Sequence, residues 1–275
     1  MNMDELTKKA YGLRRDVVEE VYRSAAGHIG GDLSVMDILT VLYFKVMNVS
    51  PKNWDSPERD RFFLSKGHCV DALYMVLGEK GFFDKQEAIN TFSAYNSRFI
   101  GHPNTEVPGI EMNSGSLGHG LALGVGTALA ARMDGRNYRT YVVLGDGEMA
   151  EGSNYEAMMA AAHYKLDNLC ATVDLNRLQI SGTTREVMYS DDLGEKFKAF
   201  GWHVIHVEDG NDCGQLVAAY EEAAGMKERP SVLIAHTVKG KGVSFMEDNK
   251  SWHHGVMTGE QYRTAVRELR EVEHE

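Results

Sequence analysis

Five short apolar segments that alternate with helical patterns place the strongest limit on the fold of this chain. They are rich in β-branched and aromatic residues, and in chain order they read RFFLS, TYVVLGD, LCATVDLN, WHVIHV and SVLIAH. Most are followed by glycine, aspartate or asparagine and then by a helical pattern. Continuous apolar runs of this kind are typical of parallel strands covered on both sides. The sequence therefore predicts an α/β fold: a doubly wound, mainly parallel sheet with helices on both faces.

The two ends of the chain are predicted to be helical. Apolar residues recur at steps of three and four from Leu6 to Val21, which indicates an amphipathic helix. The segment SAAGHIGGDLS follows, and the helical pattern resumes from Ser34, so residues 4–47 form a helical N-terminal segment. A charged helix is expected from about Thr258 onward. No internal repeat or linker interrupts the pattern, so residues 1–275 are expected to form a single domain.

Charge and composition exclude several classes of function. The chain of 275 residues is 43% hydrophobic and 25% charged, and its net charge is −11. This acidic balance argues against nucleic acid or an anionic membrane surface as the main partner. No segment reads as a signal peptide or a membrane span, so we expect a cytoplasmic protein. Cys69, Cys170 and Cys213 fit neither a zinc pattern nor an even disulfide framework, and we expect buried, reduced thiols.

A carboxylate between two glycines ends the second apolar run. In an open parallel sheet, ligands collect beyond the carboxyl ends of the strands, and Gly145 and Gly147 would let the backbone approach a ligand closely. The next strand ends in Asn176, 30 residues after Asp146, so both side chains should lie at one rim. A carboxylate, an amide oxygen and a nearby backbone carbonyl suit Mg²⁺ or Ca²⁺, with positions left for phosphate oxygens. A lone Gly-Asp-Gly is most often only a turn, so the spacing to Asn176 is what favours a metal-diphosphate site.

Seven motifs in fixed order make a family resemblance specific. They are SAAGHIGGDLS, FFLSKGH, GHPN, NSGSLGHGL, GDGEMAEGSNYEA, DLNRLQISG and TVKGKGVSFMEDNKSWHHG. From about residue 5 to 260 the chain resembles the N-terminal, diphosphate-binding domain of transketolase. The resemblance implies that Asp146, Asn176 and the carbonyl of Leu178 hold the metal of thiamine diphosphate. The chain departs from the family pattern in GHPN, in GHIGG and at His119, positions that bear on substrate preference.

The resemblance also assigns roles to loop histidines. His68 and His254 should contact the diphosphate, and His254 also counts among the catalytic residues. His28 and His102 should line the sugar channel, donate to hydroxyl groups and shuttle protons near neutral pH. The adjacent His253 leaves the registration of His254 open.

Backbone groups and two acids complete the implied site. Gly115 and Leu117 match positions whose backbone holds the aminopyrimidine and the middle of the cofactor. Glu151 and Glu156 match acids that lie at a subunit interface and link two active sites through shared protons. The alternative is that both acids merely complement the dipole at the start of a helix.

The implied reaction is the transfer of a two-carbon ketol unit from a ketose phosphate to an aldose phosphate, with thiamine diphosphate as electron sink and Mg²⁺ or Ca²⁺ as its metal. The family also needs a glutamate on a pyrimidine-binding domain, which reaches the cofactor across a subunit interface. Nothing in this sequence resembles that domain. We therefore predict the N-terminal subunit of a split transketolase, whose C-terminal partner subunit carries the pyrimidine-binding domain, in a heterotetramer of two chains of each kind. The glycine-rich segment LGHGLALGVGTALAA would face the partner, although a helix packed inside the chain is an equal reading.

Two alternatives stay open at this point. The chain could be half of another thiamine diphosphate enzyme, such as a deoxyxylulose-phosphate synthase or a dehydrogenase. It could also be a noncatalytic scaffold that has kept the fold. His28, His68, His102 and His254 favour transketolase over the first alternative, and the intact Asp146 and Asn176 argue against the second.

Overall fold

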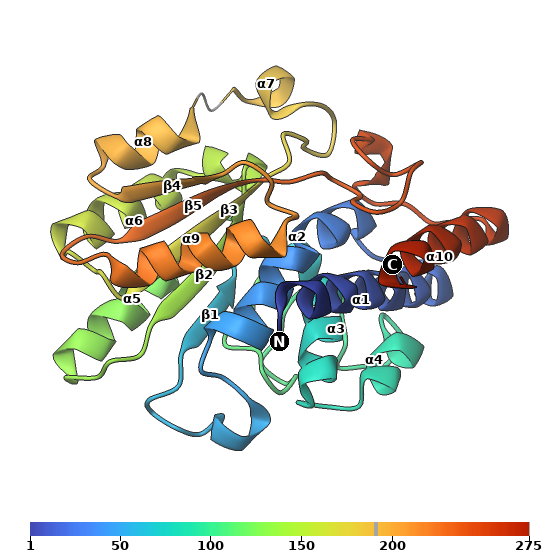
Figure 1. The fold of residues 1–275 in the computed structure, drawn as a ribbon, viewed down its shortest axis with the longest axis horizontal. Helices are drawn as coiled ribbons and strands as arrows, with labels where there is room; N and C mark the ends of the chain where they lie inside the picture. The colour runs from blue at the N-terminus through green and yellow to red at the C-terminus, as the bar shows by residue number, and fades with distance from the viewer. Residues whose placement is uncertain (190–191, 275) are drawn as a thin grey trace.

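Five parallel strands form the central sheet in the computed structural model, which describes residues 1–189 and 192–274 (Figure 1). Their order across the sheet is β1-β2-β3-β5-β4, and each neighbouring pair is parallel. The strands are β1 (Arg61–Leu64), β2 (Thr140–Gly145), β3 (Leu169–Leu175), β4 (His203–Val207) and β5 (Ser231–His236). Each lies within one of the five predicted segments, so the doubly wound α/β prediction is confirmed.

Helices cover both faces of this sheet. One face carries α5 (Gly120–Met133), α6 (Gly152–His163) and α8 (Leu193–Ala199), and the other carries α1 (Met3–Ser24), α2 (Ile29–Val41), α3 (Val70–Lys80) and α9 (Cys213–Gly225). Shorter or peripheral elements are the π-helical turn η1 (Leu42–Val46), α4 (Lys85–Thr91), the 3-10 turn η4 (Gly147–Ala150), α7 (Thr184–Val187) and α10 (Gly259–His274). Val142 and Val143 of β2 point into opposite cores, and both are buried. Burial on both faces explains why the strand segments are continuously apolar.

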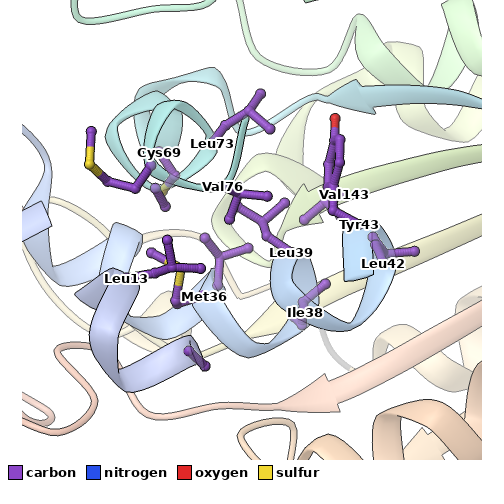
Figure 2. Close-up of a cluster of buried hydrophobic side chains, with 14 of the residues drawn as sticks. Leu13, Met36, Ile38, Leu39, Leu42, Tyr43, Cys69, Leu73, Val76 and Val143 are labelled. Carbon is purple, nitrogen blue, oxygen red and sulfur yellow. The ribbon is translucent and has the colours of Figure 1, made fainter. Parts of the chain in front are cut away.

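The N-terminal helices differ in how much surface they bury. Asn2 and Glu5 form a capping box that starts α1, and this helix buries an apolar stripe. Every residue of α2 is buried, because the helix lies inside the core between α1, α3 and the sheet. Figure 2 shows Leu13 of α1, Met36 and Leu39 of α2, and Val76 of α3 in this cluster.

The start of α2 corrects the prediction of a helix that resumes at Ser34. The helix begins at Ile29, so Gly30 and Gly31 lie in its first turn. A β carbon on Gly30 would lie 2.5 Å from the carbonyl oxygen of Trp252, and one on Gly31 would lie 2.6 Å from Cys69 Sγ. The two glycines therefore let α2 pack closely against Trp252 and Cys69, and they do not interrupt the helix.

Two further expectations concern thiols and membranes. Cys69, Cys170 and Cys213 are buried and free, as predicted. Within residues 1–189 and 192–274, no helix combines the length and the apolar character needed to cross a bilayer.

A buried ion pair joins α1 to α2. The Arg14 guanidinium contacts the Asp37 carboxylate and donates from Nε and Nη2 to the Leu33 carbonyl, at 3.0 and 2.9 Å. Asp37 also accepts a hydrogen bond of 2.8 Å from Asn211 Nδ2, in the loop after β4. Both charged side chains are almost fully buried, so neither has water as an alternative partner.

We predict that Arg14→Met lowers the free energy of unfolding by about 3–5 kcal/mol, because it leaves the Asp37 carboxylate buried without a counter-charge. The double variant Arg14→Met/Asp37→Leu should recover most of this loss, since no buried charge remains. Urea unfolding followed by circular dichroism measures both values. Lys198→Met removes the exposed pair with Glu195, whose side chains are 68% and 67% exposed, and should change stability by less than about 1 kcal/mol. Equal losses in Arg14→Met and Lys198→Met would contradict the role given to burial.

Candidate functional site

A cavity of about 500 Å³ lies at the carboxyl edge of the sheet. It forms where two loops diverge: the chain after β3 leads to α8 on one face, and the chain after β5 packs with α1 and α2 on the other. Divergence of this kind opens a crevice in doubly wound sheets. Every predicted site residue except His254 lines the cavity, namely His28, His68, His102, Gly115, Leu117, Gly145, Asp146, Gly147, Glu151, Asn176 and Leu178.

The predicted metal ligands lie together at the ends of β2 and β3. Asp146 is 3% exposed, and its carboxylate accepts hydrogen bonds from the backbone N–H of Gly147 at 2.8 Å and of Arg177 at 2.5 Å. Asn176 Oδ1 accepts from the N–H of Leu178 at 3.1 Å. Each of these oxygens keeps a second lone pair. A carboxylate, an amide and a carbonyl oxygen fit Mg²⁺ or Ca²⁺ whose coordination is completed by oxygens of a ligand.

These ligands do not form an all-protein metal site. Among the residues that the structure describes, no three histidine, cysteine, aspartate or glutamate side chains converge closely enough to hold a metal ion. Burial, followed by the nearby charge of Asp174, raises the pKa of Asp146 to about 6. A cation at its oxygens would oppose both effects and favour the ionised carboxylate. The donor set therefore suits a metal that enters with an anionic ligand.

Two buried lysines face the same cavity. Lys66 lies just after β1 and forms an ion pair with Asp174, which is fully buried on β3. Burial opposes the charge on Lys66, but the Asp174 carboxylate outweighs it and raises the pKa of the lysine. The pair also holds the pKa of Asp174 below its usual value against the effect of burial.

Lys239, which follows β5, has no such counter-charge. Its side chain is 2% exposed, and Nζ lies 3.4 Å from the Leu178 carbonyl oxygen and 2.9 Å from His253 Nδ1. No carboxylate in the described chain forms an ion pair with it. Burial, and then the charge of Lys66, lower its pKa. A buried ammonium group without a counter-ion favours an anion in the cavity.

Four imidazole rings gather around that of His28. The ring centroids of His254, His68, His253 and His102 lie 5.0, 5.4, 5.6 and 5.9 Å from that of His28. Burial, with smaller contributions from the neighbouring histidines and Lys239, lowers the pKa of His28 to about 4. Burial also lowers the pKa of His68 and His102. At neutral pH His28, His68 and His102 are uncharged, so each has one donor and one acceptor nitrogen for hydroxyl groups.

The structure separates the two adjacent histidines whose registration the sequence leaves open. His253 lines the cavity beside Lys239, and burial, then the charge of Lys239, lower its pKa to about 3. His254 is exposed and does not line the cavity, although its ring lies beside that of His28. Of the two adjacent histidines, His253 is therefore the one that lines the cavity.

Three acids follow Asp146 along the chain. Glu151, the residue before α6, is exposed and lines the cavity, and Glu156 is exposed on α6. Neither forms the buried pair that the resemblance suggests for the assembled enzyme, and their position at the start of α6 also suits the helix dipole. Glu148 also lines the cavity but, in contrast to both, is buried.

Sequence reasoning missed Lys66, Lys239 and Glu148, and it left open whether His253 or His254 faces the site. Each lysine lies within one of the family motifs: Lys66 in FFLSKGH and Lys239 in TVKGKGVSFMEDNKSWHHG. Each also follows a strand of a parallel sheet, which places it at the same rim as Asp146 and Asn176. That position was the available signal, because a lysine there is close to any ligand bound at the strand ends.

Comparisons with known proteins identify the family. Residues 7–272 match the family of the transketolase thiamine diphosphate binding domain. The chain is 51% identical over 271 residues to one of the subunits of apulose-4-phosphate transketolase from Phocaeicola vulgatus, a match that spans 98% of this chain and 96% of that protein. It is 40% identical to a 6-deoxy-6-sulfo-D-fructose transketolase subunit of a Clostridium species, over 96% of both chains.

A solved structure shows the same fold. Transketolase from Campylobacter jejuni superposes with a TM-score of 0.93 at 30% sequence identity. The match covers 98% of this chain but only 43% of that transketolase. This chain is therefore a member of the transketolase family, and its residues 7–272 correspond to the family's thiamine diphosphate-binding domain.

Proposed function

We propose that this chain is the diphosphate-binding subunit of a two-subunit transketolase, with residues 1–275 as one diphosphate-binding domain. It would bind thiamine diphosphate through Mg²⁺ or Ca²⁺ and, with a C-terminal partner subunit, transfer a two-carbon ketol unit from a ketose phosphate to an aldose phosphate. The observation that carries this proposal is the buried Lys239 without a counter-ion, which contacts the carbonyl of Leu178 beside Asp146. A diphosphate with its metal supplies the missing negative charge and uses the free oxygens.

We assign the side chains of the cavity to two groups. Asp146, Asn176 and the Leu178 carbonyl would hold the metal, and Lys239 and His253 would meet the diphosphate. His68 would also meet the diphosphate, as the resemblance implies, and its ring centroid is 5.4 Å from those of both His253 and His28. When bound, thiamine diphosphate supplies the carbanion and the electron sink for cleavage of a carbon–carbon bond.

The second group faces the substrate. His28 and His102 are uncharged at neutral pH, so they can accept a proton from one sugar hydroxyl while donating to another. Gly115 and Leu117 would present backbone groups to the middle of the cofactor. Gly115 has a φ of +151°, a conformation that side-chain-bearing residues rarely adopt.

The relatives suggest the class of substrate. The names of two of them contain sugars that end in an anionic group, apulose-4-phosphate and 6-deoxy-6-sulfo-D-fructose. Among the described residues that line the cavity there is no arginine, and its imidazoles are uncharged. We therefore propose that this subunit binds the hydroxyl groups of a sugar phosphate, whereas the partner subunit binds its anionic end.

Exposed apolar side chains support a partner subunit. Leu123 and Met133 on α5 and Met159 on α6 are exposed, and Ile180 and Met188 form an apolar rim at the cavity. Surfaces of this kind are typical of protein–protein interfaces. We propose that the partner covers both areas in a heterotetramer of two chains of each kind, so that every active site lies between subunits.

We predict that the isolated chain, with Mg²⁺ and thiamine diphosphate, shows no ketol transfer, because the group that activates the aminopyrimidine lies on the partner. Addition of the partner subunit should produce activity and a heterotetrameric mass in light scattering. Asp146→Ala is the matched control: it should assemble to the same mass but stay inactive. Full turnover by the isolated chain would refute the split-enzyme proposal, and full turnover by assembled Asp146→Ala would refute the metal site.

A second prediction separates the histidine roles in the assembled enzyme. His68→Ala should raise the concentration of thiamine diphosphate needed for half-maximal activity by about 10-fold or more, with kcat largely restored at saturation. His102→Ala should leave that concentration unchanged but lower kcat or raise KM for the sugar. Steady-state kinetics at varied cofactor and sugar measure both. The exposed His163, at the far end of α6, provides a control whose replacement by alanine should change neither. A defect in His102→Ala that extra cofactor abolishes would contradict the two roles.

A further inference from the structure

The buried carboxylate of Glu148 joins three segments around the cavity. It is 2% exposed, and its Oε1 accepts hydrogen bonds from Ser65 Oγ and, at 2.8 Å, from the N–H of Gly118. Its Oε2 accepts from the N–H of Gly145 at 3.0 Å. Asn154 Nδ2 donates to the Glu148 carbonyl at 2.9 Å, which fixes the backbone of the acid. The donors come from the loop after β1, the loop before α5 and the end of β2.

The Gly118 peptide is held on both sides by this part of the chain. Its N–H donates to Glu148, and its carbonyl accepts a hydrogen bond of 2.8 Å from Ser153 Oγ. Gly118 has a φ of +85°, and a β carbon there would lie 2.6 Å from Cβ of Glu151. Ser65 Oγ extends the network, because it also accepts from the N–H of Gly120 at 3.1 Å. The 115–120 loop is thus tied to the segment that follows Asp146.

Two parts of the proposed cofactor site meet at this carboxylate. Asp146 and Gly147 lie directly before Glu148 and belong to the metal-diphosphate side. Gly115 and Leu117 lie directly before Gly118 and belong to the side that would hold the middle of the cofactor. Both pairs line the same cavity, and so does Glu148, whose carboxylate is 2% exposed and already uses both of its oxygens.

We propose that Glu148 is a positioning residue that sets the spacing between the metal-diphosphate segment and the 115–118 loop, so that one rigid cofactor fits both. This inference rests on the proposed function. A carboxylate suits the task because it only accepts, and three donors converge on it from two sides. Glutamine would direct an NH₂ group toward a backbone N–H or the Ser65 hydroxyl and leave at least one buried donor without an acceptor.

Asp60 offers a matched control at the opposite edge of the sheet. Its carboxylate is also buried and accepts two backbone hydrogen bonds, from Asn48 and Arg139, both of 2.8 Å. It stands before β1 and far along the strands from the cavity. Glu148→Gln and Asp60→Asn therefore make the same chemical change, one at the cavity and one away from it.

The first test needs no cofactor. Hydrogen exchange of the isolated chain, followed by mass spectrometry or NMR, reports the backbone N–H groups. Glu148→Gln should accelerate exchange at Gly118 and Gly145 by about 10-fold or more, since each loses or weakens a hydrogen bond. Asp60→Asn should do so at Asn48 and Arg139 and leave Gly118 unchanged. Wild-type exchange at Gly118 and Gly145 in Glu148→Gln would overturn the proposal.

The second test uses the chain assembled with its partner subunit. Isothermal titration with thiamine diphosphate and Mg²⁺ should show Kd raised about 10-fold in Glu148→Gln, equal to about 1.4 kcal/mol, and unchanged in Asp60→Asn. At saturating cofactor, kcat should stay within about 2-fold of wild type, because Glu148 touches no reacting atom. An equal rise in Kd in both variants would show a merely structural role and overturn the proposal. A wild-type assembly that binds no thiamine diphosphate would refute the proposed function and leave the exchange result standing.

If Glu148→Gln does not fold, Ser65→Ala provides a second variant for the same measurements. It removes one donor but leaves the carboxylate and its two backbone hydrogen bonds in place. Gly120 then loses the hydroxyl acceptor for its N–H, so exchange at Gly120 should rise and Kd should increase by about 3-fold. Unchanged exchange at Gly120 together with unchanged Kd would overturn the proposal.

Discussion

The buried charge of Asp174 holds the floor of the cavity together. It lies on β3 and is fully buried, with the ammonium group of Lys66, the hydroxyl of Thr237 and the hydroxyl of Ser34 around it, the last at 2.6 Å. These partners come from the loop after β1, the loop after β5 and α2. Ser34 Oγ also accepts from Nδ2 of Asn176 at 3.5 Å, so the network reaches a proposed metal ligand.

This network explains why charges of both signs can be buried at the carboxyl edge of the sheet. Removal of either partner of a buried ion pair leaves an uncompensated charge, so the geometry of the pair is tightly specified. Lys66 is neutralised within the protein, whereas Lys239 on the other side of the cavity is not. The cavity therefore combines one unmatched cation with the oxygens of Asp146, Asn176 and Leu178. That combination is complementary to a metal-bound diphosphate, and the uncharged imidazoles beside it suit the hydroxyl groups of a sugar.

Much of the fold and part of the site could be predicted because they depend on local patterns. Strands buried on both faces must be apolar throughout, and the spacing from Asp146 to Asn176 follows from one strand-helix-strand unit. The start of α2 could not be predicted, because Gly30 and Gly31 are required by contacts with Trp252 and Cys69, which lie far away in sequence.

The roles of long side chains were missed for a similar reason. The contacts of Lys239 and Glu148 form only when the segments before α5 and after β1, β2, β3 and β5 come together in the fold. A single sequence does not show which charged side chains form ion pairs. Whether His253 or His254 lines the cavity depends on the conformation of the turn that precedes them, since adjacent residues point in different directions.

The proposed function depends most on a metal ion held by Asp146 and Asn176 against the diphosphate of the cofactor. Electron–nuclear double resonance on the assembled enzyme, with Mn²⁺ in place of Mg²⁺, detects this contact, because a large isotropic hyperfine coupling to phosphorus requires a phosphate oxygen bound to the metal. We expect this phosphorus coupling in the presence of thiamine diphosphate and its loss in Asp146→Ala. Mn²⁺ that binds to the wild-type enzyme with thiamine diphosphate but shows no phosphorus coupling would contradict the proposed contact.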